Sequence, residues 1–180
     1  MRKVIATVSV LAFVLGLYVF ATHAQEDKSK RPSPPATATL DLGGGKSITI
    51  DYSSPRAKGR KLGTDIAPFG QVWRVGANEA TTFVPTADVI VGGAAVPAGN
   101  YTLFAIPDKD KWTLIISKTT GEWGTKYSGA SADLARVDMK VSTLPSFVEN
   151  FTISFDKTPT GGTLNLDWEN TRASVPIVKK

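Results

Sequence analysis

The groups that could bind a ligand or take part in a reaction are concentrated between residues 54 and 83. Arg56, Arg60 and Arg74 lie within a span of 19 residues, and Lys58 stands between the first two. A guanidinium group presents paired N–H donors that match two oxygens of a carboxylate, sulfate or phosphate at once. This spacing therefore predicts a site for a small anion.

An indole and two polar side chains follow in the same stretch. Trp73 offers a flat apolar surface on which a sugar or an aromatic ring can stack, and Asn78 and Glu79 could orient such a ligand. The predicted ligand site consists of Arg56, Lys58, Arg60, Trp73, Arg74, Asn78 and Glu79. The alternative is a structural use of the same residues, in which Arg74 pairs with Glu79 and Trp73 fills the core. The sequence leaves both uses open.

Composition removes several kinds of chemistry. The only histidine, His23, lies in an N-terminal apolar segment that we expect to be removed, and the chain has no cysteine. Ser-His-Asp and Cys-His catalysis, the usual zinc sites and haem ligation are therefore excluded for the remaining chain. We predict no cofactor and no metal ligand, although carboxylate oxygens for a hard cation such as Ca²⁺ remain in the composition.

The N-terminus has the pattern of a secretory signal peptide. Arg2 and Lys3 precede an apolar run over residues 4–21, and Thr22 and Ala24 supply the small residues before a cleavage point. We predict cleavage after Ala24 and a periplasmic or secreted protein. An uncleaved segment would be just long enough to anchor the chain in a membrane, and no other membrane contact is expected.

The rest of the chain is expected to form a tether and one domain. Residues 25–35 are charged and then proline-rich, which predicts an extended tether. Residues 36–180 are long enough for a single hydrophobic core. Cleavage lowers the net charge from +5 to +3, since 19 basic residues then face 16 acidic ones. That excess is too small to predict a nucleic-acid partner, and the oligomeric state is left open.

Alternation of apolar and polar residues with a period of two recurs along the domain. It flanks Gly43 to Gly45, which predicts a hairpin. Further strands are predicted at residues 101–106, 112–117, 134–141, 151–155, 164–168 and 172–177. Ile115 predicts a central strand that is covered on both faces, whereas Pro176 predicts an edge strand because proline lacks an N–H donor. The expected fold class is all-β: a single antiparallel β-sandwich, jelly-roll-like, or a flattened barrel.

Several strings of the sequence resemble a bacterial family known as domain of unknown function 2911. The strings are Ser54-Pro-Arg-x-Lys-Gly-Arg60, Trp73-Arg-x-Gly-Ala-Asn-Glu-Ala-Thr81, Pro97-Ala-Gly-x-Tyr-x-Leu-Phe-x-Ile-Pro107, Trp112-Thr, Trp123-Gly, Phe151-Thr-Ile-x-Phe155 and Val175-Pro-Ile. The resemblance covers essentially residues 40–177. The resemblance implies an exported, single-domain β protein, and it implies no particular activity.

Three functions remain open at this point. The first is a binding or accessory protein whose partner is a small anionic or sugar-like ligand. The second is an enzyme that works without histidine, such as a carboxylate-based hydrolase or lyase in which Glu79 is the acid or base and Asp65 is the only other acid nearby. The third is a structural or protein-interaction module of the cell envelope.

Overall fold

The computed structural model describes residues 27–123 and 126–180. The predicted signal peptide and its cleavage point after Ala24 lie outside these residues. The strands are β1 (Pro35–Gly43), β2 (Lys46–Ser53), β3 (Leu62–Gly63), β4 (Ile66–Pro68), β5 (Thr81–Pro85), β6 (Val89–Val91), β7 (Ala94–Val96), β8 (Tyr101–Ile106), β9 (Lys111–Ser117), β10 (Asp133–Thr158) and β11 (Gly161–Lys179). Two 3₁₀ turns accompany them, η1 (Lys28–Lys30) and η2 (Ala130–Ala132).

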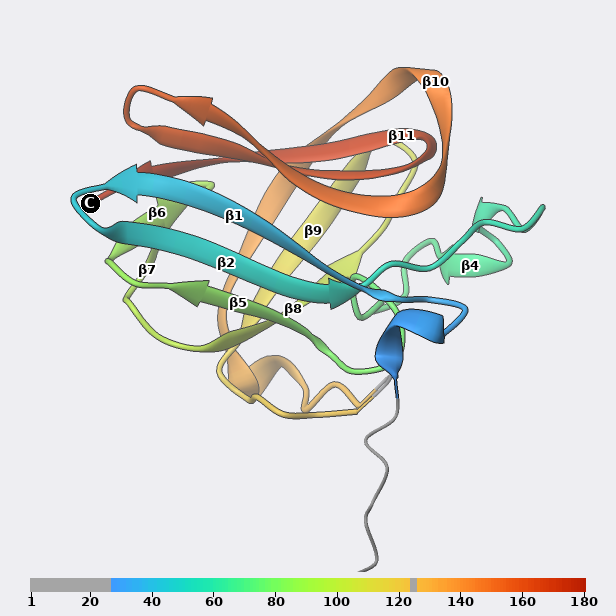
Figure 1. Ribbon diagram of the computed structural model, residues 1–180, viewed down its shortest axis with the longest axis horizontal. Coiled ribbons are helices and arrows are strands. Elements are labelled where there is room, and N and C mark those ends of the chain that lie inside the picture. Colours follow the sequence, from blue (N-terminus) through green and yellow to red (C-terminus); the bar gives the residue numbers. More distant parts are fainter. Residues whose placement is uncertain (1–26, 124–125) are drawn as a thin grey trace, which may run out of the picture.

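Nine of these strands form one antiparallel sheet in the order β1-β2-β5-β8-β9-β10-β11-β6-β7. The remaining pair, β3 and β4, is parallel and stands off from the sheet at one end, near η1 (Figure 1). The β1–β2 turn and the C-terminus lie at the opposite end (Figure 1). The predicted all-β, antiparallel fold is confirmed, and the sheet is not closed into a barrel because β1 and β7 do not pair.

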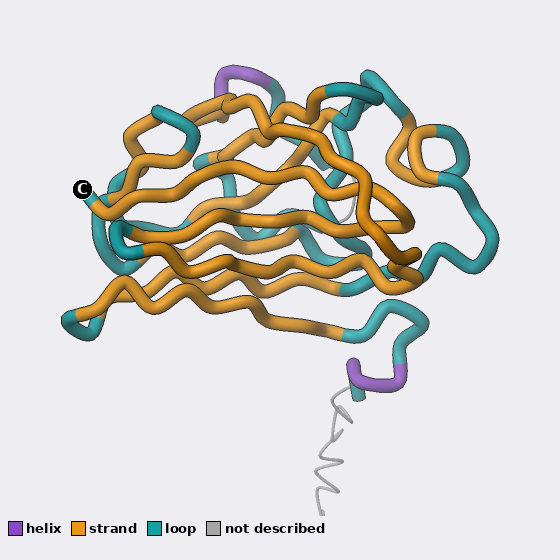
Figure 2. Tube along the Cα trace, turned by 90° about the horizontal axis from the view of Figure 1, so that it is seen from above, coloured by secondary structure: helices purple, strands orange, loops and turns teal. Residues whose placement is uncertain are grey.

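The β10–β11 hairpin bends sharply (Figure 1), which folds the sheet over on itself, and the view from above shows strands lying one behind another (Figure 2). The pairing of the two strands is interrupted between Thr143 and Thr152, which is typical of a β-bulge. Beyond the bend the hairpin lies next to β1, where a Cβ on Gly162 would come within 2.9 Å of the Leu40 side chain. The two halves of the sheet thus face each other across one core.

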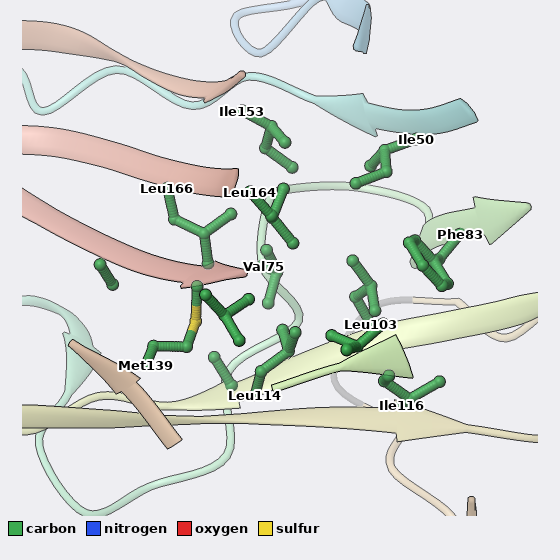
Figure 3. Close-up of a cluster of buried hydrophobic side chains, with 14 of the residues drawn as sticks. Ile50, Val75, Phe83, Leu103, Leu114, Ile116, Met139, Ile153, Leu164 and Leu166 are labelled. Atoms are coloured by element: carbon green, nitrogen blue, oxygen red, sulfur yellow. The ribbon is translucent and has the colours of Figure 1, made fainter. Parts of the chain in front are cut away.

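That core is built from the apolar faces of both halves. Ile50, Leu103, Leu114, Ile153 and Leu164 converge in its centre (Figure 3). In β9 the side chains on both faces are buried, Ile115 included, so the predicted central strand is confirmed. Residues 134–141 are strand, as the alternation predicts.

The predicted edge position of Pro176 is wrong. Residues 161–179 form one continuous strand, β11, which lies between β10 and β6. The pairing with β10 ends at Ser174, and the pairing with β6 begins only at Ile177. Pro176 therefore lies where β11 changes partners, and its missing N–H interrupts neither ladder.

The described part of the predicted tether lies against the domain. Its residues 28–30 form η1, and β1 begins at Pro35. Within residues 27–123 and 126–180, no helix is long and apolar enough to cross a membrane.

Candidate functional site

Trp73 is fixed by both its main chain and its ring. Its N–H donates to the Ala105 carbonyl at 2.7 Å, and the Ala105 N–H donates back at 2.8 Å, which attaches this residue to β8. The indole stacks on Trp168 with ring centroids 5.6 Å apart and meets Phe151 edge-on at 4.9 Å. Such ring pairs stabilise beyond the area they bury. Trp73 is therefore a rigid, half-buried surface at the border of the core.

The chain after Trp73 turns sharply around a buried anchor. Val75 is fully buried, and its φ of 50° is unusual for a β-branched residue. Its carbonyl accepts a hydrogen bond from the Thr81 hydroxyl at 2.7 Å. A Cβ on Gly76 would come within 3.0 Å of the Ser53 carbonyl oxygen, so this position needs glycine. The anchored turn holds Arg74 and Asn78 at the surface around it.

Arg74, Gly76 and Asn78 line a pocket of about 480 Å³, which we call the Arg74 pocket. Its wall is made of Ser33, Pro55, Arg60, Ile66, Ala67, Pro68, Gln71, Val72, Trp73, Arg74, Gly76, Ala77, Asn78 and Trp168. None of these residues is acidic, and two are arginines. The volume is in the range of pockets that hold small organic ligands, roughly 300–1,000 Å³.

Arg74 lies in this pocket without an acidic partner. Its side chain is partly buried, and the loss of solvent lowers the pKa of the guanidinium from its ordinary value. The one hydrogen bond it makes among the described residues runs from Nη1 to the Asn78 carbonyl, at 3.5 Å. The predicted Arg74–Glu79 ion pair does not form, since no ion pair within the described chain includes Arg74. A partly desolvated charge without a counterion is a group that an anion could stabilise.

Arg60 lines the same pocket but is partly occupied. Its Nε donates to the Ala57 carbonyl at 3.1 Å and its Nη2 to the Arg56 carbonyl at 2.7 Å. These bonds fold the side chain back on its own loop. Arg60 therefore adds positive charge to the pocket but has fewer donors left for a ligand.

Arg56 and Lys58 do not reach the pocket. The Arg56 guanidinium donates to the Ser54 carbonyl and hydroxyl oxygens and is held inside the loop. Lys58 is exposed, and its main-chain N–H donates to the Glu149 carboxylate at 2.8 Å. Both residues serve the loop that packs against the bend of β10.

Glu79 lies in a separate cluster with the N-terminal segment. It accepts from Lys28 Nζ at 2.8 Å and from Arg31 Nη1 at 2.9 Å through both carboxylate oxygens. The hydrogen bond from Lys28 and the contact with Arg31 lower the pKa of Glu79 from 4.5 to about 2. We call Lys28, Arg31 and Glu79 the Glu79 cluster; it borders a small pocket of about 170 Å³.

The structure thus brings together four of the seven predicted site residues: Arg60, Trp73, Arg74 and Asn78. Sequence reasoning did not single out Ser33, the β4 residues, Gln71 or Trp168 as site residues. Gln71 directly precedes the tryptophan motif and could have been found there. Ser33 and Trp168 lie 40 residues before and 95 residues after Trp73, so only the fold reveals them.

The described residues suggest no metal centre. Between residues 27 and 123 and from 126 onward, no three His, Cys, Asp or Glu side chains are grouped to hold a metal ion. The donors of the Arg74 pocket are guanidinium and amide groups, which suit an anion rather than a cation.

The fold and the site define an all-β protein that carries an arginine- and tryptophan-lined pocket near one end of a folded-over sheet. The chain belongs to the family described as "Protein of unknown function (DUF2911)", whose family model matches residues 33–177. The family resemblance seen in the sequence is confirmed. No curated protein and no solved structure matches the chain.

Proposed function

We propose that this protein is an exported binding or accessory protein that holds a small anionic or sugar-like ligand in the Arg74 pocket. The observation that supports this most strongly is the state of Arg74, a partly buried cation that has no carboxylate partner among the described residues. A ligand anion would supply the missing counterion. Charged hydrogen bonds in such a partly dry site are stronger than those in water.

The rigidity of the wall also favours binding. The indole of Trp73 is held by Trp168, Phe151 and Trp112, and its main chain is bonded to β8. The turn behind it includes Val75 in an unfavourable backbone conformation, which the surrounding packing maintains. A preformed site loses little conformational freedom when the ligand arrives.

A binding role agrees better with this geometry than carboxylate catalysis does. Glu79 is engaged by Lys28 and Arg31, and no acidic side chain lines the Arg74 pocket. Hydrolysis by a pair of carboxylates needs both of them beside the bond that is cut. The proposal of export rests on the N-terminal charge and apolar pattern.

Thermal-shift screening against small anions and saccharides tests the binding role. We expect at least one of these compounds to raise the melting temperature of the wild-type protein and to have a much smaller effect on Arg74→Gln. Lys61→Gln is the matched control, because Lys61 is an exposed cation of the same stretch that does not line the pocket. A shift that is equal in all three proteins, or absent from all three, would refute the proposal.

Export is tested separately. The full chain, produced in a Gram-negative host, should be found in the periplasmic fraction with a mass that lacks residues 1–24. A full-length chain retained in the cytoplasm would contradict it.

A further inference from the structure

Arg74 is the cation of the Arg74 pocket whose donors are least engaged. Arg74 makes one long contact, whereas Arg60 already gives two of its N–H groups to main-chain carbonyls. The main-chain N–H groups of Trp73 and Ala77 are also bonded, to carbonyls at 2.7 and 3.1 Å. Phosphate sites usually combine several free main-chain N–H groups with cations. One free guanidinium fork instead matches the two oxygens and single charge of a carboxylate.

The apolar residues that line the pocket indicate what kind of group carries the carboxylate. Ile66, Pro68 and Val72 line the pocket together with Trp73. Aromatic and aliphatic walls of this kind pack against one face of a ring, either an aromatic ring or the C–H face of a pyranose.

Two amides supply polar contacts at the same pocket. The Asn78 side chain donates from Nδ2 to the Ser33 carbonyl at 3.0 Å, which fixes its orientation and leaves its oxygen as an acceptor. Gln71 is exposed and lines the same pocket. These groups can pair with hydroxyls on the edge of a ring.

We propose that the ligand of the Arg74 pocket is a monocarboxylate carried on a six-membered ring, with Arg74 binding the carboxylate through its paired N–H groups and Trp73 contacting the ring. This inference rests on the proposed binding function and narrows it from any small anion or sugar to one chemical class. The class has two sources, sugar acids and aromatic acids, and both share this chemistry.

Isothermal titration with matched compounds tests the proposal. The sugar-acid arm compares D-glucuronate with D-glucose and D-glucose 6-phosphate, and the aromatic arm compares phenylacetate with benzyl alcohol and benzyl phosphate. In at least one arm, the carboxylate should bind at least about tenfold more tightly than both matched compounds, as expected for a charged hydrogen-bonded pair. The arm that binds identifies the source.

Variants of Arg74 show whether the carboxylate is bound where we propose. Arg74→Gln should weaken carboxylate binding at least about tenfold, and Arg74→Lys should restore only part of it because an ammonium group has no fork. Lys61→Gln should bind like the wild type. Quenching of tryptophan fluorescence, which reports contact with the indole, should follow the same order.

The outcomes separate this inference from the proposed function. Binding of a phosphate or a neutral sugar that depends on Arg74 and equals or exceeds carboxylate binding overturns the monocarboxylate and leaves the binding function standing. Carboxylate binding that is the same in Arg74→Gln also overturns it. If none of these compounds binds, and the wider anion and saccharide screen is also negative, both proposals fail.

Discussion

The Arg74 pocket and the Glu79 cluster use neighbouring residues of one motif in opposite ways. Arg74 is a partly buried cation that lacks an acidic partner among the described residues, whereas Glu79 is a carboxylate with two cations around it. Asn78, between them, has a left-handed φ of 56°, which turns the chain. The cations that neutralise Glu79 come from residues 28 and 31. Lys28 and Arg31 of the N-terminal segment thus neutralise Glu79. Because Glu79 pairs with them and not with Arg74, the Arg74 guanidinium stays available.

The largest effect should follow from removing the ring behind the pocket. Trp168→Ala should lower the free energy of unfolding by about 3 to 5 kcal/mol, because Trp168 is 1% exposed and stacks on Trp73. Urea denaturation measures this. Trp123→Ala is the matched control, since Trp123 is 61% exposed and should lose less than about 0.5 kcal/mol. An equal loss of unfolding free energy in the two variants would show that Trp168 does not stabilise the core.

The next experiment compares the two arginines directly. Arg74→Met should raise the free energy of unfolding by about 1 kcal/mol, because it removes a partly desolvated charge that no carboxylate compensates. Arg31→Met should lower it by less than about 1 kcal/mol, because it removes one of the two partners of the partly exposed Glu79. Both values come from urea denaturation at neutral pH. Destabilisation by Arg74→Met as large as that by Arg31→Met would contradict the comparison.

The Glu79 cluster should also make the stability of the folded protein depend on pH. The pKa of Glu79 is about 2 in the folded chain and 4.5 ordinarily, so its ion pairs add stability above pH 4.5. This contribution is lost as the pH falls from about 4.5 to 2. Because the partners are partly exposed, we expect less than about 1 kcal/mol, reduced further by salt.

Glu79→Gln isolates this contribution. The difference in unfolding free energy between wild type and Glu79→Gln should be largest at neutral pH and should vanish near pH 2. Asp110→Asn is the control. It also removes an exposed carboxylate, but Asp110 forms no ion pair within the described chain. A difference that is independent of pH would show that the ion pairs do not stabilise the fold.

The smallest effect concerns the loop outside the pocket. Lys58 has a left-handed φ of 48° and an exposed side chain, so Lys58→Gly should raise the free energy of unfolding by about 0.5 kcal/mol. Its main-chain bond to Glu149 is kept. Lys46→Gly in β2 should instead lower stability by about 0.5 to 1 kcal/mol. Ligand binding should be unchanged in Lys58→Gly, since Lys58 lies outside the Arg74 pocket.

The strands could be predicted from sequence because their apolar side chains alternate locally. The β1–β2 hairpin and β9 follow directly from that pattern. The continuity of β11 could not be predicted, because its bend depends on packing against β1 and on the interrupted pairing with β10. Pro176 was misplaced for a related reason: a proline also fits where a strand changes neighbours.

The candidate site could be located only in part. Arg60, Trp73, Arg74 and Asn78 are close in sequence and share the pocket. The pairing of Glu79 depends on residues 48 and 51 positions earlier in the chain, which no local pattern reveals. Trp168 looks like a core residue in the sequence and is one, but its edge also lines the pocket.

One measurement tests the central claim most directly, namely that the Arg74 guanidinium is free to bind an anion in the Arg74 pocket. Protein labelled with ¹⁵N-arginine is titrated with D-glucuronate and, separately, with phenylacetate, and the side-chain Nε–H signals are followed by NMR. We expect the Arg74 signal to move saturably with at least one of these compounds, while the Arg31 signal, already bound to Glu79, stays in place. A static Arg74 signal throughout, or an equal movement of both signals, would contradict the account.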